Sequence, residues 1–142
     1  MNWKENFYKT KVKPYEKYEK EAAERVAKLY KVEIFELFNK NNGNKYDFVD
    51  SNNIKYEVKF DRYSLKSGNF FIEYFGYCKL SGISITEANY YIITDEQNYY
   101  LISVKKLKKI CKKNGYEKRT KDNLTRGYCI QKEFIIKNSQ II

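Results

Sequence analysis

Residues 45–60, KYDFVDSNNIKYEVKF, constrain the fold more than any other part of this chain. Three polar residues, Ser51-Asn52-Asn53, separate two runs of strand-forming residues. In the second run the side chains alternate, with Ile54, Tyr56, Val58 and Phe60 on one face and Lys55, Glu57 and Lys59 on the other. The pattern predicts a β-hairpin with strands over 45–50 and 54–60.

The length of the turn decides which side chains face each other across this hairpin. A three-residue loop pairs Asp50 with Ile54 and puts Asn53 in the left-handed conformation, which asparagine tolerates. Asp47 is then directly opposite Glu57 on the same face, with Cβ atoms about 5 Å apart. A two-residue turn would place Asp47 on the opposite face, so the length of the turn tests whether Asp47 and Glu57 face each other.

Two carboxylates facing each other repel unless a cation lies between them. Mg²⁺ binds carboxylate oxygens and keeps several waters for a substrate phosphate. Lys59 follows Glu57 by two residues and points to the same side, where an ammonium group can lower the pKa of a water or stabilise charge developing on a phosphate. The alternative interpretation is a solvated strand face with an ordinary ion pair.

The composition narrows the chemistry that remains available. The chain has 142 residues and no histidine, so histidine triads, histidine general bases and histidine–metal sites are excluded. Its three cysteines are widely spaced, and we expect them to be reduced thiols. No apolar run is long enough to cross a membrane and residues 1–15 contain no apolar leader segment, so we expect a cytoplasmic protein, or one of host cytoplasm or nucleoplasm if the source is viral.

A helix is expected to begin near Pro14, with Glu19 in the middle of its apolar face. The predicted buried face comprises Tyr15, Tyr18, Ala22, Ala23, Val26, Leu29 and Tyr30. A buried carboxylate is unfavourable unless it is paired or bound to a metal, so Glu19 is a candidate to reach the same metal site or a second one. The alternative is that the helix is rotated and Glu19 is solvated.

The rest of the chain reads as a single α+β domain, sandwich-like, with a mixed central β-sheet flanked by helices. Its core is expected over residues 15–104 and a basic helix and strand over 105–142. The further predicted elements begin with a strand over 32–38, a loop over 39–45 and an aromatic strand over 70–77. They continue with a loop over 81–88, which contains a helical turn capped by Thr86, and with a hairpin of strands 89–94 and 99–104. The last are a helix over 105–114 with an apolar stripe of Val104, Leu107, Ile110 and Cys111, a connection over 116–127 and a strand over 128–136.

Residues 105–126 hold most of the net charge of +10, with ten Lys or Arg against Glu117 and Asp122. We expect this segment to contact nucleic-acid phosphates rather than to read bases. A solvated helix face is the alternative, and the apolar stripe of the helix is too narrow for insertion into a membrane surface. The expected contributors are Lys55, Lys105, Lys108, Lys112, Arg119 and Arg126.

Asp47 and the Glu57-Val58-Lys59 triplet resemble the motif of the PD-(D/E)XK nuclease superfamily, which has the restriction-endonuclease-like fold. Glu19 resembles the acidic residue that the fold carries on its first helix, whereas Tyr46 replaces the proline of the motif. Residues 67–77 and 81–94, SGNFFIEYFGY and SGISITEANYYIIT, resemble small phage and viral nucleases of this superfamily, some of them likened to Holliday-junction resolvases.

This resemblance covers about residues 15–104 and implies Mg²⁺-dependent cleavage of duplex or branched DNA, with Mn²⁺ as an expected substitute and a homodimer for resolvases. It assigns Asp47, Glu57, Glu19 and the Val58 carbonyl to the metal and Lys59 to the attacking water.

Five residues outside the motif are further candidates near this site. Glu73 is either another metal ligand or water-positioning residue, or a solvent-facing strand glutamate. Ser81, Ser84 and Thr86 either hydrogen-bond a phosphate or a catalytic group, or cap the loop. Tyr63 is a candidate to stack on an unpaired base, while most of the fifteen tyrosines read as core and sheet residues.

Two other functions compete with the nuclease. A non-catalytic basic module would bind nucleic acid without a divalent ion, and the acid-acid-lysine set argues against it. An enzyme acting on small nucleotides is disfavoured because no glycine-rich phosphate loop occurs.

Overall fold

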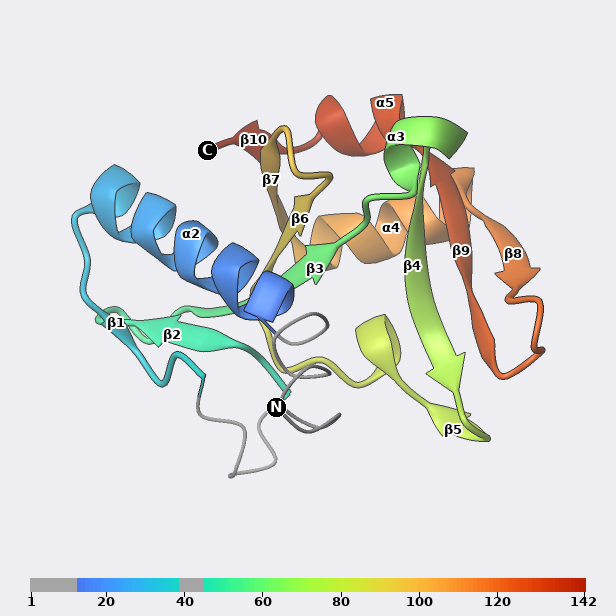
Figure 1. Cartoon of the computed structure of the whole chain (residues 1–142), viewed down its shortest axis with the longest axis horizontal. Helices are drawn as coiled ribbons and strands as arrows, with labels where there is room; N and C mark the ends of the chain where they lie inside the picture. The colour runs from blue at the N-terminus through green and yellow to red at the C-terminus, as the bar shows by residue number, and fades with distance from the viewer. Residues whose placement is uncertain (1–12, 39–44) are drawn as a thin grey trace, which may run out of the picture.

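The computed structural model describes residues 13–38 and 45–142, which form two β-sheets with helices around them (Figure 1). The predicted loop over 39–45 falls almost wholly outside this part. The first sheet has the strand order β1-β2-β3-β6-β7-β10 and the second has the order β5-β4-β9-β8. Strands β3 and β6 run parallel and the other neighbours antiparallel, so the predicted α+β class is confirmed.

The elements follow each other in the order α, β, β, β, α, β, β, 3₁₀, β, β, α, β, β, α, β. Their bounds are α2 Lys13–Tyr30, β1 Ile34–Phe35, β2 Phe48–Asp50, β3 Lys55–Phe60, α3 Ser64–Ser67, β4 Asn69–Gly76, β5 Lys79–Leu80, η2 Gly82–Ser84, β6 Tyr90–Thr94, β7 Tyr99–Ser103, α4 Val104–Asn114, β8 Tyr116–Arg119, β9 Thr125–Gln131, α5 Lys132–Ile136 and β10 Gln140–Ile141.

Helix α2 covers one face of the first sheet (Figure 1). Its central positions Tyr18, Ala22, Ala23 and Val26 are buried against side chains of β2, β3, β6 and β7. Glu19 lies among them and is only 8% exposed, so its predicted burial is confirmed. The predictions for Tyr15, Leu29 and Tyr30 were wrong, because these residues belong to the end turns of α2 and are exposed.

The opposite face of the first sheet packs against the second sheet and α4, and this interface forms the larger core. The predicted apolar stripe of α4 is confirmed, since Val104, Leu107, Ile110 and Cys111 are all buried. The Ser103 side chain caps the helix by accepting from the Lys106 N–H at 3.1 Å. The helix ends at Gly115, where a Cβ atom would lie 2.7 Å from the Cys111 carbonyl oxygen.

Several predicted elements need correction. Only residues 34–35 of the predicted strand 32–38 are a strand, and the chain turns at Glu36, whose φ is 63°. The connection predicted over 116–127 is instead the hairpin of β8 and β9. The strand predicted over 128–136 ends at Gln131, after which α5 begins.

Thr86 does not cap a helical turn, because the turn precedes it at Gly82–Ser84. Its hydroxyl instead accepts from the Ala88 N–H at 3.1 Å and donates to the Lys45 carbonyl at 3.2 Å. One central sheet was expected, but β4 pairs with β9 and forms a second sheet. Strand pairing between distant segments depends on packing that no local pattern encodes.

Candidate active site

The first hairpin has the register that the sequence predicts. Phe48 pairs with Tyr56 and Val49 with Lys55, and the Asp50 N–H donates to the Ile54 carbonyl at 2.9 Å. Asn53 has a φ of 61°, as the three-residue turn requires. Strand β2 begins at Phe48, so Asp47 lies directly before it.

Asp47 continues the edge of β3 with both its backbone and its side chain. Its N–H donates to the Tyr56 carbonyl at 2.7 Å, and its Oδ2 accepts from the Val58 N–H at 2.6 Å. The carboxylate therefore takes the place that a backbone carbonyl of a longer β2 would occupy. It also lies close enough to Glu57 to raise the pKa of that residue electrostatically.

Glu57 lies on the face of the first sheet that is turned away from α2. It pairs with Tyr91 across the parallel strands β3 and β6, and Tyr91 belongs to the larger core. Burial is the largest influence on Glu57 and raises its pKa; Asp47 raises it further, while Lys59 and Tyr91 act in the opposite direction. Its Oε2 atom is buried and makes no hydrogen bond within residues 13–38 and 45–142, although Nζ of Lys59 lies 3.6 Å away.

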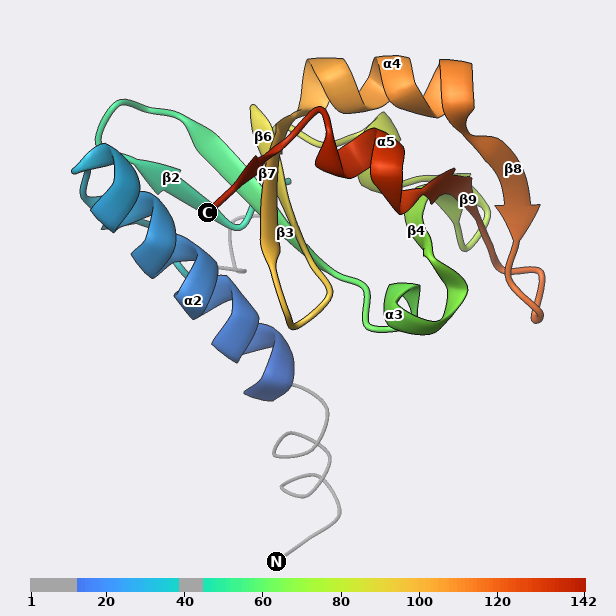
Figure 2. The same ribbon diagram turned by 90° about the horizontal axis from the view of Figure 1, so that it is seen from above.

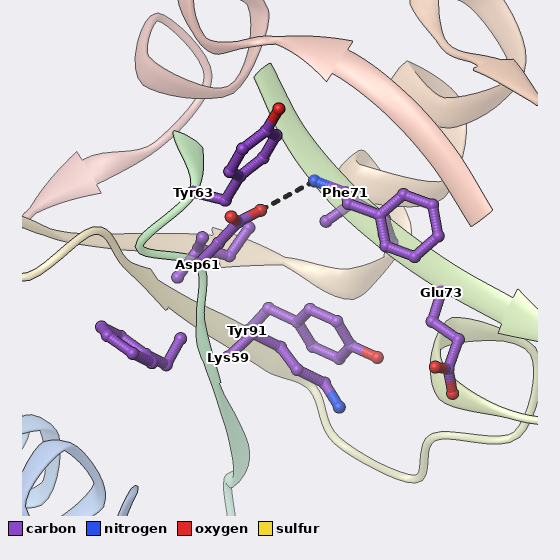
Figure 3. A pocket seen from close by; sticks show the side chains of 9 residues that line it. Lys59, Asp61, Tyr63, Phe71, Glu73 and Tyr91 are labelled. Atoms are coloured by element: carbon purple, nitrogen blue, oxygen red, sulfur yellow. Dashed lines mark hydrogen bonds between the residues drawn. The ribbon is translucent and has the colours of Figure 1, made fainter. Parts of the chain in front are cut away.

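Lys59 leads from this pair into a cavity of about 430 Å³ between β3 and β4, called the first cavity below. Its walls include Lys59, Asp61, Tyr63, Phe71, Glu73 and Tyr91. Figure 3 shows the Lys59 ammonium, the Tyr91 hydroxyl and the Glu73 carboxylate pointing toward the same part of it. Asp47 and Glu57 adjoin this cavity through Lys59 but are not among its walls.

Glu73 faces Lys59 from β4, and its carboxylate is held in place. The Ser81 hydroxyl donates to Glu73 Oε2 at 2.7 Å. Ser81 thus bonds a candidate acid of the site, whereas the Ser84 hydroxyl donates to the Tyr74 carbonyl at 2.9 Å. Gly82 permits the close approach of this loop, because a Cβ there would lie 2.2 Å from the Glu73 carbonyl oxygen.

Asp61 closes the end of the cavity and was not singled out in the sequence. Its carboxylate accepts from the N–H groups of Phe71 and Ser64 at 2.9 and 3.1 Å. Burial raises the pKa of Asp61, and these two bonds oppose that effect. An acid that follows the alternating strand by one residue is a signal that could have identified it. No local signal could have identified Tyr91, since its place depends on the pairing of β3 with β6.

Glu19 is buried on the other side of the first sheet. It belongs to α2, which packs against the face that carries Tyr56, whereas Glu57 and Lys59 are on the opposite face. Within the described residues, no three Asp, Glu or Cys side chains gather closely enough to hold a metal ion. The structure thus brings Asp47, Glu57 and Lys59 together and places Glu73 across the cavity from them. Glu19 lies on the opposite face of the first sheet from Glu57 and Lys59.

The basic residues divide between two sides of the molecule. Lys105, Lys108 and Lys112 are exposed on α4, which lies on the other side of β4 from α3 and therefore away from the first cavity (Figure 2). Arg119 ends β8 and lines a neighbouring cavity. The remaining two cover aromatic rings, with Lys55 5.0 Å from the Tyr46 ring centre and Arg126 5.1 Å from that of Phe75.

The cysteines and the helices add little to the site. Cys78 is exposed and Cys111 and Cys129 are buried, all as free thiols, and burial raises the pKa of Cys111 to about 12. No helix in the described part of the chain is long and apolar enough to cross a membrane.

Comparison with protein-family models, with characterised proteins and with solved structures finds no match to this chain.

Proposed function

We propose that the protein is a metal-dependent DNA endonuclease of the PD-(D/E)XK type that hydrolyses phosphodiester bonds. The observation that carries this proposal is the arrangement on β3, where the Asp47 carboxylate adjoins that of Glu57 and Lys59 extends from the same face into a cavity. Two neighbouring carboxylates repel each other and are unfavourable in a fold unless a cation compensates them.

The residues present fit a hard divalent cation. Glu57 supplies a buried carboxylate oxygen that makes no hydrogen bond in the described part of the chain. Asp47 uses Oδ2 for the Val58 N–H, and in an extended strand the carbonyl of Val58 points to the same edge as its N–H. Mg²⁺ in proteins is commonly held by one or two carboxylates with water and substrate phosphate, so three clustered acids are not required.

When bound, such an ion polarises the phosphate and lowers the pKa of a water. The residues of the chain supply the rest. Lys59 places a positive charge where the negative charge of the phosphate increases during attack. Glu73, fixed by Ser81 across the cavity, is an acceptor that can orient a water molecule. Glu19 has a supporting role in this proposal, through the packing of α2 against β3.

Single substitutions test the proposal directly. Asp47→Asn or Glu57→Gln is expected to lower cleavage while DNA binding persists. The loss should exceed about 100-fold, because changes to residues that only support a metal ligand already cost up to about that much. Glu24→Gln removes the same charge from an exposed position of α2 and serves as the control. Cleavage retained in either site variant contradicts the proposal.

The substrates in this assay separate the remaining alternatives. A four-way junction, a linear duplex, a nicked duplex and a single strand are incubated with Mg²⁺, Mn²⁺ or EDTA. Preference for the junction supports a resolvase-like enzyme, and cleavage of the linear duplex supports a general endonuclease. Salt-dependent binding that needs no divalent ion and gives no cut product supports the non-catalytic binding module, which the charge of residues 105–126 favours.

A further inference from the structure

A second cavity of about 190 Å³ adjoins the first one and shares three of its wall residues, Asp61, Tyr63 and Phe71. Its other walls include Lys118, Arg119 and Thr120 from the β8–β9 hairpin. The two cavities are therefore successive parts of one depression, which runs from Lys59 past Tyr63 to the end of β8.

We propose that this depression is a track for single-stranded DNA, in which an unpaired base stacks on Tyr63 and the flanking phosphates contact Lys118 and Arg119. The proposal rests on the proposed nuclease function, because the track leads a strand toward Lys59. It also replaces α4 by the β8–β9 hairpin as the basic element that serves the site.

The aromatic wall is suited to a base. Tyr63 is 71% exposed although it lies between the two cavities, and Phe71 stands beside it on β4. Figure 3 shows the Asp61 carboxylate next to Tyr63, with a dashed line for the hydrogen bond that it accepts from the Phe71 N–H. Stacking on such a side chain requires a free base face, which a single strand offers and a continuous duplex does not.

The charge along the track suits a polyanion. Lys118 and Arg119 are both exposed at the far end and Lys59 lies at the near end. Asp61 is the acid common to both cavities, but its carboxylate accepts two backbone hydrogen bonds and lies near Lys132, so its charge is partly compensated. Ser67, Asn69 and Thr120 add polar groups around the second cavity.

The experiment measures binding without cleavage, by fluorescence anisotropy of a labelled single-stranded DNA in EDTA, with a duplex of the same length for comparison. Tyr63→Ala is expected to weaken single-strand binding by roughly tenfold, within the range for loss of one stacked base, and Tyr63→Phe to leave it unchanged. Lys118→Glu with Arg119→Glu is expected to weaken it by more, and to flatten its dependence on salt.

Matched controls come from other parts of the chain. Tyr77→Asn removes a tyrosine of equal exposure, 72%, at the turn after β4, and asparagine tolerates its φ of 52°. Lys109→Glu with Lys113→Glu makes the same charge change on the exposed face of α4. Both controls are expected to bind within about twofold of the unaltered protein.

The proposal is overturned if Tyr63→Ala binds as well as the unaltered protein, if the α4 variant loses as much binding as the β8 variant, or if the duplex binds more tightly than the single strand. Glu57→Gln separates this result from the nuclease proposal, since it is expected to abolish cleavage and to retain the track. If the unaltered protein cleaves DNA but Tyr63→Ala does not weaken single-strand binding, the nuclease proposal is retained and the track proposal is rejected.

Discussion

Glu57 holds a carboxylate in a buried position next to a second acid, and the proposed function therefore predicts that divalent ions stabilise the fold. Burial and Asp47 raise the pKa of Glu57, so the charged form destabilises the fold near neutral pH in the absence of a cation. We expect Mg²⁺ or Mn²⁺ alone to raise the melting temperature, by about 2–4 °C for each kcal/mol by which bound metal stabilises the fold. Differential scanning fluorimetry at pH 7.5 measures the shift.

The variant Glu57→Gln is expected to change both the melting temperature without metal and the response of the melting temperature to metal. Without metal it is expected to melt at or above the temperature of the unaltered protein, because it removes a buried charge. With metal its melting temperature is expected to stay constant. An equal metal-dependent shift in Glu57→Gln and in the exposed control Glu24→Gln would argue against a site at Glu57.

The residues of the site differ in how well the sequence alone predicts which side chains lie next to them. Asp47 and Glu57 face each other because a short turn fixes their register, and asparagine at position 53 marks that turn. The neighbourhood of Tyr91 could not be predicted, because it depends on the parallel pairing of β3 with β6, which are separated by the whole β4 segment. Tyr63 was recognised as a candidate, but only the two cavities show what lies on either side of it.

At the scale of elements, α4 has a start and a stop that each depend on one residue. Ser103 accepts from the Lys106 N–H and so satisfies one of the free donors of the first turn. Ser103→Ala is expected to lower the free energy of unfolding by about 1 kcal/mol, and Ser103→Asp to retain it. Urea denaturation followed by circular dichroism measures both variants, and equal losses in the two would exclude a capping role.

Elements were predicted well where the local pattern was regular. Helix α2, the first hairpin, β4, the second hairpin and α4 were all expected, since each has an amphipathic period or a clear turn. The β8–β9 hairpin was missed because charged residues interrupt its alternation and because every residue of β8 is exposed. Gly127 instead accounts for the close pairing of β9 with β4, because a Cβ there would lie 2.5 Å from the ring of Phe71 on β4.

On the scale of the whole molecule, a buried ion pair links the two sheets in addition to the apolar core between them. Nζ of Lys132, at the start of α5, lies 2.7 Å from Oδ2 of Asp95 in the turn between β6 and β7. Asp95 is 2% exposed, and its Oδ1 also accepts from the N–H groups of Gln97 and Asn98 at 2.9 Å. Because α5 directly follows β9, this contact adds a polar link between the second sheet and the first.

The same pair makes stability depend on acid. Burial alone would raise the pKa of Asp95, but the bond from Lys132 and the two backbone N–H groups outweigh it and lower the pKa below the ordinary value of 3.8. The unfolded chain therefore binds the proton at a higher pH than the folded one, so this contribution is complete above pH 3.8 and is lost as the pH falls through the folded pKa.

Lys132→Met removes one partner and leaves the Asp95 carboxylate buried without its cation. We expect the free energy of unfolding at pH 7 to fall by about 3–5 kcal/mol, the range for breaking a buried pair from one side. Lys132→Met with Asp95→Asn is expected to recover part of this loss, because the second change removes the uncompensated charge. Urea denaturation at pH 7 and pH 3 gives the comparison, and the variant should lose less stability than the unaltered protein between these values. If Lys132→Met instead keeps the full acid dependence, Asp95 is stabilised by its backbone donors alone and the sheets are held together by the apolar core.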